Sequence, residues 1–117
     1  MKVNSVRSFF LFSYTIIILS MSLFSPSLIV NSEYIYKYDK IAHLIEFFFL
    51  GILFSNAQVY NNKKIIFSGL LYIAFIGFID ELIQSFIIIR NADIIDLLFD
   101  IIGGFFGLIF MNKIKND

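Results

Sequence analysis

The sequence has 117 residues, of which 59% are hydrophobic, 19% aromatic and only 15% charged, whereas a typical soluble domain carries about 25% charged residues. Because so few polar side chains cannot cover the surface of a small soluble domain, the composition excludes an ordinary soluble fold and predicts a protein embedded in a lipid bilayer. The formal net charge is zero and cysteine is absent, which gives no support for a nucleic-acid partner and excludes disulfides, thiolate catalysis and cysteine-held metal centres.

Four apolar stretches are long enough to cross a bilayer, whose hydrocarbon core of about 30 Å requires roughly 20 residues of helix. These stretches are residues 9–30, 41–60, 65–89 and 94–111. A transmembrane barrel would instead show alternating segments of about ten residues, and these are missing. The sequence therefore predicts an all-α membrane protein with one domain over residues 1–117, built as a bundle of about four transmembrane helices.

The first stretch has a second interpretation. A basic segment, Met1–Arg7, precedes an apolar run, and this order is also typical of a secretory signal peptide. However, the run is longer than the roughly 7–15 residues usual in such a segment, and no cleavage site of the A-x-A type stands out. A helix that is retained in the membrane is the favoured interpretation.

Basic residues in the flanks predict the orientation, because Lys and Arg concentrate in cytoplasmic loops. With the N-terminus inside, the cytoplasmic side receives Lys2, Arg7, Lys63, Lys64, Lys113 and Lys115, and the outer side receives Lys37, Lys40 and Arg90. We therefore expect both termini in the cytoplasm. The short segment 61–64 is expected to join the second and third helices as an antiparallel hairpin.

Ionisable residues interrupt the last three stretches. Each would cost roughly 2.5–3.5 kcal/mol at the centre of a bilayer, so a functional role is the default interpretation. Near the start of the second stretch, Asp39, His43 and Glu46 are spaced four and three residues apart. This spacing places all three on one face of a helix.

The third and fourth stretches carry their polar residues at the same predicted depth. In the third, Asp80 and Gln84 share one helical stripe, Glu81 lies on the next stripe, and Arg90 follows near the outer boundary. One face of the fourth carries Asp93, Asp96, Asp100, Gly103 and Gly107. All three helices thus place polar residues in the outer half of the membrane, which predicts one outward-facing polar pocket between them.

Several carboxylates in such a pocket would oppose one another's ionisation, and Lys40, His43 and Arg90 are the nearby groups that could offset them. A protonated carboxyl group, or a histidine coupled to a carboxylate, is what general acid–base catalysis requires. The catalytic candidates are His43, Asp39, Glu46, Asp80 and Glu81. The binding candidates are Lys40, Gln84, Arg90, Asp96 and Asp100.

Structural interpretations compete with these roles. Asp39 and Lys40 could cap and anchor the second helix at the membrane interface, and Asp93 and Asp96 could cap the fourth. The histidine could belong to a structural ion pair. The G-x-x-x-G pattern of Gly103–Gly107 is more typical of close helix packing than of a site. The coincidence of polar residues on three helices is what favours a functional site.

A metal site is a less favoured interpretation. Asp39, His43 and Glu46 resemble a mixed oxygen and nitrogen ligand set, to which carboxylates of the third and fourth helices could add oxygens. With one histidine and no cysteine, any metal would be a hard or borderline divalent ion such as magnesium, manganese or zinc. From the sequence we assign no metal ligand and no cofactor.

Three segments, in order, resemble the sequence blocks of VanZ-like membrane proteins. Residues 39–47, DKIAHLIEF, are similar to that family's D-K-x-x-H-F-x-E-Y. Residues 80–86, DELIQSF, are similar to D-E-x-x-Q-x-F, which an arginine follows, here Arg90. Residues 96–103, DLLFDIIG, are similar to D-x-x-x-N-x-x-G. The sequence departs from the pattern at Asp100, where asparagine is usual, at Phe47, where tyrosine is frequent, and at 88–89, where Pro-Gly is usual.

The resemblance covers most of the chain and implies a multi-pass protein of the bacterial cytoplasmic membrane, with its polar site facing outside. The family is named for a protein associated with resistance to the glycopeptide antibiotic teicoplanin, and it brings no established mechanism with it. Three functions are therefore open. The first is an enzyme acting on a lipid-linked or cell-wall substrate. The second is a non-catalytic accessory or binding protein that alters antibiotic access. The third and least favoured is a proton-coupled carrier, for which four helices are few unless the protein forms a homo-oligomer.

Overall fold

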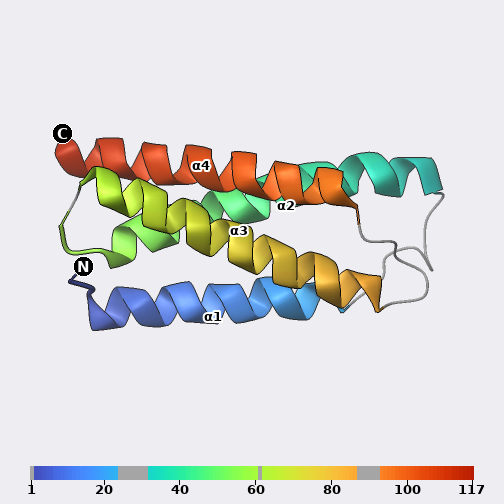
Figure 1. The fold of residues 1–117 in the computed structure, drawn as a ribbon, viewed down its shortest axis with the longest axis horizontal. Coiled ribbons are helices and arrows are strands. Elements are labelled where there is room, and N and C mark those ends of the chain that lie inside the picture. Colours follow the sequence, from blue (N-terminus) through green and yellow to red (C-terminus); the bar gives the residue numbers. More distant parts are fainter. Residues whose placement is uncertain (1, 24–31, 61, 87–92) are drawn as a thin grey trace.

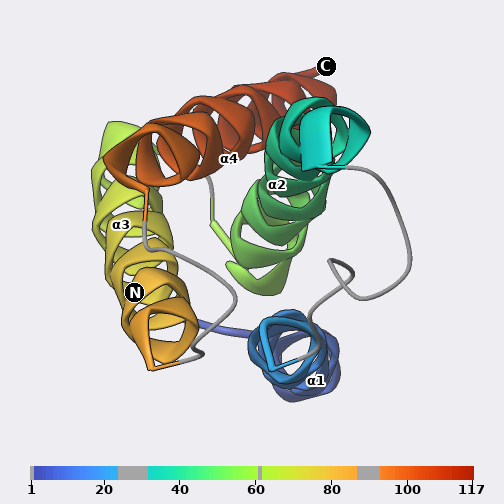
Figure 2. The same cartoon turned by 90° about the vertical axis from the view of Figure 1, so that its right-hand side faces the viewer.

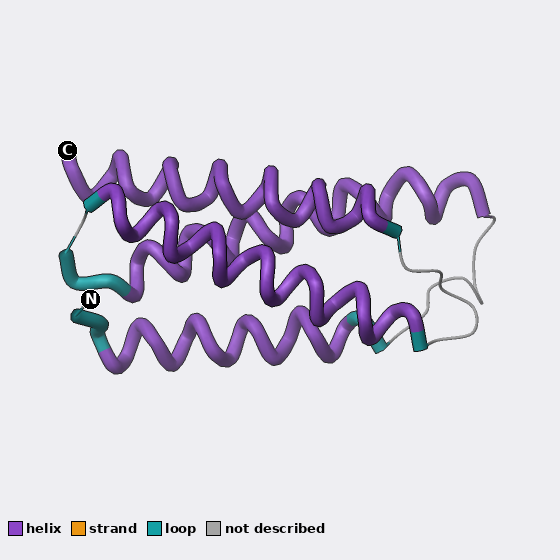
Figure 3. Tube along the Cα trace, viewed as in Figure 1, coloured by secondary structure: helices purple, strands orange, loops and turns teal. Residues whose placement is uncertain are grey.

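The protein is a bundle of four helices, shown in Figure 1, in a computed structural model that describes residues 2–23, 32–60, 62–86 and 93–117. The helices are α1 (Ser5–Met21), α2 (Ser32–Ala57), α3 (Lys63–Ser85) and α4 (Ile94–Asn116). Within the described ranges the only extended pairing is an isolated bridge between Val3 and Gln58. The predicted all-α fold is therefore confirmed (Figure 3).

Three of the helices are long and apolar enough to cross a membrane. These are α3, α4 and the part of α2 from Tyr38 to Ala57. α1 has 17 residues and is the shortest. Large apolar side chains cover the outside of the bundle, where Phe9, Phe67 and Phe75 keep 67%, 66% and 61% of their surface exposed. Lipid tails solvate such a surface, so the protein is an integral membrane protein.

The first helix does not have its predicted limits. α1 begins at Ser5 rather than at residue 9, because the side chain of Asn4 accepts a hydrogen bond from the backbone N–H of Arg7 (3.1 Å) and caps the helix there. It ends at Met21 rather than at residue 30, and residues 24–30 of the predicted span lie outside the described residues. Hydropathy does not report such caps, since the capping residue is polar.

The other three helices also extend beyond, or stop short of, their apolar stretches. α2 begins before its apolar stretch, and α3 ends at Ser85, with residues 87–89 outside the described residues. α4 continues past residue 111 to Asn116. There the ammonium group of Lys115 donates hydrogen bonds to the carbonyl oxygens of Ser55 (2.5 Å) and Gln58 (2.7 Å) at the end of α2. Carbonyl groups at the end of a helix lack the usual intrahelical partners, and that of Ser55 has a long bond from the backbone N–H of Gln58 (3.3 Å). The lysine therefore strengthens the bonding of these carbonyls and ties α4 to the end of α2.

The helices alternate in direction, so that specific ends meet. Figure 1 shows both termini at one end of the bundle, together with the connection from α2 to α3. The start of α2, the end of α3 and the start of α4 lie at the other end. Seen along the bundle in Figure 2, α1 lies against α2 and α3 on the side opposite α4. The termini therefore share one side of the bundle, as predicted, and their assignment to the cytoplasm remains a prediction.

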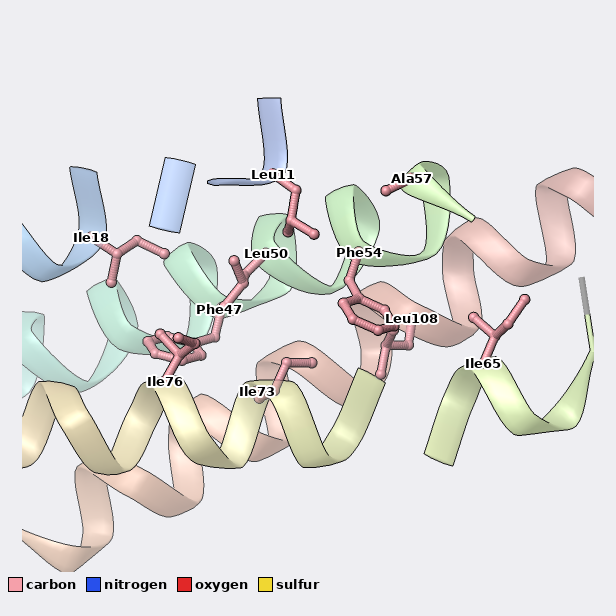
Figure 4. Close-up of a cluster of buried hydrophobic side chains, with 10 residues drawn as sticks. All are labelled: Leu11, Ile18, Phe47, Leu50, Phe54, Ala57, Ile65, Ile73, Ile76 and Leu108. Carbon is pink, nitrogen blue, oxygen red and sulfur yellow. The ribbon is translucent and has the colours of Figure 1, made fainter. Parts of the chain in front are cut away.

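Apolar side chains from all four helices form the core, shown in Figure 4. Phe47 and Leu50 of α2 and Ile73 of α3 are fully buried, and they pack with Ile18 of α1 and Leu108 of α4. The remaining core residues are Leu11, Phe54, Ala57, Ile65 and Ile76. This core holds the helices in fixed register, and that register decides which polar residues meet at the end of the bundle.

Glycines allow α2 and α4 to approach closely. A β-carbon at Gly107 would collide with the carbonyl oxygen of Phe48, and one at Gly103 would collide with that of Leu44. A β-carbon at Gly51, on the facing helix, would lie 2.9 Å from the backbone nitrogen of Leu108. The packing interpretation of the G-x-x-x-G pattern is therefore correct, and this contact also fixes how α4 presents its carboxylates to α2.

We expect Gly107→Ala to destabilise the bundle much more than Gly69→Ala, although both add one methyl group. At Gly107 the new group meets backbone of α2, which cannot move without separating the helices, whereas at Gly69 it meets the flexible end of the Leu108 side chain. Overpacking of a rigid core costs about 1–3 kcal/mol. Thermal unfolding in detergent should show a lower midpoint for Gly107→Ala. Equal midpoints for the two variants would contradict the close backbone contact.

Candidate functional site

Buried polar side chains gather at the end of the bundle away from the termini. Six of them retain less than a tenth of their surface, namely His43 of α2, Asp80, Glu81 and Gln84 of α3, and Asp96 and Asp100 of α4. All six were predicted as site residues, and the structure brings them together from three helices. We call these six residues the polar cluster.

His43 lies at the centre of the polar cluster. Its Nδ1 atom is 2.7 Å from Oδ1 of Asp100 and 3.8 Å from Oδ2 of Asp80. Its Nε2 atom is 3.8 Å from Oδ2 of Asp39 and 4.0 Å from Oδ2 of Asp96. One imidazole ring thus faces carboxylates from α2, α3 and α4.

Asp100 owes its buried position to a glycine that the sequence reasoning missed. Asp100 has no exposed surface, and one of its carboxylate oxygens lies 3.0 Å from the place where a β-carbon of Gly77 would be. A β-carbon at this position would press on that oxygen and on the side chain of Leu97, so the glycine lets Asp100 lie against α3. The signal in the sequence was the spacing of Gly77 three residues before Asp80, which places both on one side of α3.

Lys40 joins α2 to the start of α4. Its ammonium group donates hydrogen bonds to Asp96 (2.6 Å) and to Asp93 (3.0 Å), and only 13% of its side chain is exposed. These bonds do not match the competing structural interpretation, in which Lys40 only anchors α2 at the membrane interface. The lysine instead compensates Asp93, which caps α4, and Asp96 in its first turn.

Two further hydrogen bonds tie α3 into the site. The side-chain amide of Gln84 donates to Oδ2 of Asp80 (3.1 Å), one turn away on the same helix. The carboxylate of Glu81 accepts a hydrogen bond from the backbone N–H of Asp93 (2.9 Å), immediately before α4. The end of α3 and the start of α4 are thus held together by a side chain of the polar cluster.

Asp93 caps α4, as the capping interpretation predicted, whereas Asp96 is buried in the polar cluster. The carboxylate of Asp93 accepts a hydrogen bond from the backbone N–H of Ile95 (2.9 Å). This bond makes the largest contribution to lowering the pKa of Asp93 below its usual value, and the hydrogen bond from Lys40 lowers it further. The charged form of Asp93 therefore stabilises the folded state.

Asp93→Asn is expected to lower stability by about 0.3–1 kcal/mol at pH 7, because asparagine keeps the cap but loses the charge at the helix N-terminus. Since the folded-state pKa is lowered, the wild-type advantage exists above the unfolded pKa of about 3.9 and is lost as pH falls through the folded value. Thermal unfolding in detergent near pH 7 and near pH 3 measures this. A gap between the two proteins that persists unchanged near pH 3 would contradict the charge effect.

The other predicted site residues lie beside the polar cluster or outside the residues that the structure describes. Asp39 keeps a quarter of its side chain exposed and lies between His43 and the end of the bundle. Glu46 is half-buried, and its backbone carbonyl accepts a hydrogen bond from the hydroxyl of Tyr14 (3.0 Å). Among the described residues, two groups of histidine and carboxylate side chains have ligand atoms within 4.8 Å of one another, and Glu46 belongs to neither group. Arg90 lies outside the described residues.

The arrangement suits proton transfer. An imidazole N–H that donates to a buried carboxylate fixes the tautomer of the ring and leaves the other nitrogen as the base. In His43 the nitrogen bonded to Asp100 is Nδ1, so Nε2, which faces Asp39, is the atom available to take up a proton. The polar cluster therefore has the parts of a general acid–base site.

A sequence model describing the VanZ/LLP1 family matches residues 3–115. No curated protein and no solved structure gave a match. The matched region includes all three sequence blocks that resemble VanZ-like proteins and every residue of the polar cluster. Because the match covers nearly the whole chain, this protein belongs to the VanZ/LLP1 family.

Proposed function

We propose that the protein is an enzyme of the bacterial cell envelope that uses the polar cluster for acid–base chemistry on a lipid-linked or cell-wall component. The observation that carries the proposal is the 2.7 Å bond between His43 and Asp100, both buried and both in a membrane-spanning helix. Buried charged groups are costly in a membrane, and proteins retain them mainly where they function.

The proposed roles follow from the geometry. Asp100 orients the ring of His43 through Nδ1. Nε2 then accepts a proton from water or from a substrate hydroxyl group, and Asp39, which is partly exposed, carries the proton to solvent. Glu81 or Asp80 orients the attacking water or hydroxyl group, and the leaving group takes up a proton from solvent. The chain has no cysteine, and none of the six residues of the polar cluster is a serine or threonine, so the proposed reaction class is hydrolysis or transfer with water or a substrate hydroxyl as nucleophile.

The position of the site supports an amphiphilic substrate. The polar cluster lies near the ends of three membrane-spanning helices, while apolar side chains cover the outside of the bundle. A lipid-linked molecule could keep its chain in the bilayer and bring its head group to the end of the bundle. We propose that this end faces the outside of the cytoplasmic membrane, as the distribution of Lys and Arg predicts, and that Arg90 binds a phosphate or carboxylate of the substrate.

The structure gives less support to the two other functions. A binding protein would use Lys40 as a recognition group, but this lysine is engaged by Asp93 and Asp96. A proton-coupled carrier needs ionisable groups along its whole path. In the described residues the middle of the bundle is filled by apolar side chains such as Phe47, Leu50 and Ile73.

The test is incubation of the purified protein with labelled undecaprenyl-linked lipids and phospholipids, with and without divalent metal. We expect at least one of these lipids to be converted to product by the wild type. Substrates that remain untouched under all conditions would refute the enzymatic function. A double variant, His43→Gln/Asp80→Asn, serves as the control for a contaminating activity.

The family resemblance adds a proposal about antibiotics, namely that expression of the protein reduces susceptibility to teicoplanin and related glycopeptides. Susceptibility is measured in cells that carry the wild type, His43→Ala, Asp80→Ala or an empty vector. We expect only the wild type to protect. If wild-type and empty-vector cells respond equally, the link to glycopeptide resistance is wrong, whereas the enzymatic proposal is tested separately by the lipid assay.

A further inference from the structure

Three buried carboxylate oxygens in the polar cluster have no hydrogen-bond partner among the described residues. They are Oδ1 of Asp80, Oε1 of Glu81 and Oδ2 of Asp100. The other oxygen of each carboxylate is bonded, to Gln84, to the N–H of Asp93 and to His43 respectively. Buried polar atoms are rarely left without a partner, so three in one place point to a missing ligand.

These carboxylates are close enough to share one ion. The ligand atoms of Asp80, Glu81, Asp100 and His43 all lie within 4.8 Å of one another, and all four residues are buried. Two oxygens that ligate the same Mg²⁺ lie about 2.0–2.1 Å from it, hence up to roughly twice that distance from each other. Small side-chain adjustments therefore suffice to close the three carboxylates around a cation.

The charge balance favours a cation rather than another anion or a neutral ligand. Lys40 compensates Asp93 and Asp96. His43 lies against Asp80 and Asp100, and Glu81 accepts its hydrogen bond from a neutral backbone N–H. Three carboxylates against one imidazole leave an excess of negative charge at a buried place, which is costly without compensation.

The chemistry of the three atoms selects the type of ion. All are carboxylate oxygens, which suit hard divalent cations such as Mg²⁺ and Mn²⁺. The hydrogen bonds to the other oxygens would orient these ligands, as groups around a metal site commonly do. His43 in particular holds Asp100 by Oδ1 and leaves Oδ2 free to face the ion.

We propose that Asp80, Glu81 and Asp100 bind one hard divalent cation, Mg²⁺ or Mn²⁺, at the end of the bundle between α3 and α4. The cation neutralises the buried carboxylates and offers a positive charge to a phosphate or similar anionic group. This site shares Asp80 and Glu81 with the proposed reaction, but cation binding is measured without any substrate, so the two proposals can fail separately.

The test is a titration of the purified protein with Mn²⁺ in detergent. The concentration of free Mn²⁺ is measured at each step from its electron paramagnetic resonance signal. We expect one Mn²⁺ bound per chain and competition by Mg²⁺. Asp80→Asn and Glu81→Gln, which keep size and shape, should each weaken binding at least about tenfold. Asp117→Asn removes the same single charge from an exposed residue at the other end of the bundle and should bind Mn²⁺ as the wild type does.

A variant that fails to fold would also fail to bind Mn²⁺, so binding is checked by a second measurement, the shift of the unfolding temperature on adding Mn²⁺. A cation that binds only the folded state raises the unfolding temperature, so Mn²⁺ should shift the wild type and Asp117→Asn upward and leave an Asp80→Asn/Glu81→Gln double variant unchanged. A wild type that binds no Mn²⁺, or binding that is equal in the double variant, would overturn the proposal. The carboxylates would then be compensated by shared protons. If the double variant loses Mn²⁺ binding but still turns over lipid, the cation site is confirmed and the cation is not needed for the proposed reaction.

Discussion

His43→Ala is expected to lower the turnover of a lipid-linked substrate by about 10²- to 10⁴-fold, the usual contribution of a general acid or base. His43 is the one histidine of the chain, and it contacts carboxylates of α2, α3 and α4. No neighbouring imidazole can replace it. The measurement is the initial rate of product formation by equal amounts of folded wild type and variant.

His43→Gln is the matched control for this experiment. Glutamine can still donate a hydrogen bond toward Asp100 and fills most of the space, but its amide does not titrate. We expect His43→Gln to unfold at a temperature closer to that of the wild type than His43→Ala does, and to be as inactive as His43→Ala. Near-wild-type turnover by His43→Gln would show that the histidine only supports the structure.

Lys40→Met is expected to cost about 3–5 kcal/mol of stability, because removing one partner of a buried ion pair leaves the other charge uncompensated. Asp96, which is 3% exposed, is the charge left behind. Thermal unfolding in detergent measures the loss. Lys113→Met, an exposed position near the opposite end of the bundle, should change stability by no more than about 0.5 kcal/mol.

A second substitution tests the cause of that loss. Adding Asp96→Asn to Lys40→Met removes the stranded charge, so the double variant should recover much of the lost stability. This rescue is expected only if Lys40 and Asp96 interact directly. If the two losses simply add, the pair does not compensate within the bundle.

The architecture could be predicted from the sequence because it depends on two local signals, the length of the apolar stretches and the helical spacing of the polar residues. Apolar stretches of sufficient length identify membrane helices, and the helical period alone places His43 one turn after Asp39, and Asp100 one turn after Asp96. Alternating helix directions then bring the start of α2, the end of α3 and the start of α4 together (Figure 1). It could therefore be predicted, before any contact was known, that these polar residues lie at the same end of the bundle.

The sequence did not predict what depends on contacts between helices. The reach of Lys40 from α2 to α4 depends on how closely the two backbones approach, and Gly51 and Gly107 set that distance. The limits of α1 depend on a single capping side chain, Asn4, rather than on hydropathy. The space that Gly77 leaves for Asp100 likewise exists only after α3 and α4 have packed.

Asp100 is the departure from the family pattern with the clearest consequence. It is fully buried, it bonds the histidine, and it supplies one of the three unpartnered oxygens. An asparagine at this position could still accept the hydrogen bond from Nδ1 of His43 but would remove a negative charge from the polar cluster. We therefore propose that this departure strengthens the demand for a compensating cation in this chain.

The central claim is that the polar cluster is retained for function and not for stability, and the unfolding temperature of His43→Leu/Asp100→Leu tests it most directly. This variant replaces both members of the bonded pair by apolar side chains and is made in an Asp80→Asn background, so that the carboxylate 3.8 Å from His43 is not left with an uncompensated charge. Its unfolding temperature is compared with that of Asp80→Asn alone. A pair kept for function should be replaceable in this way with unchanged or increased stability, together with complete loss of lipid turnover. A large fall in the unfolding temperature would show that the pair holds the bundle together and would contradict the functional interpretation.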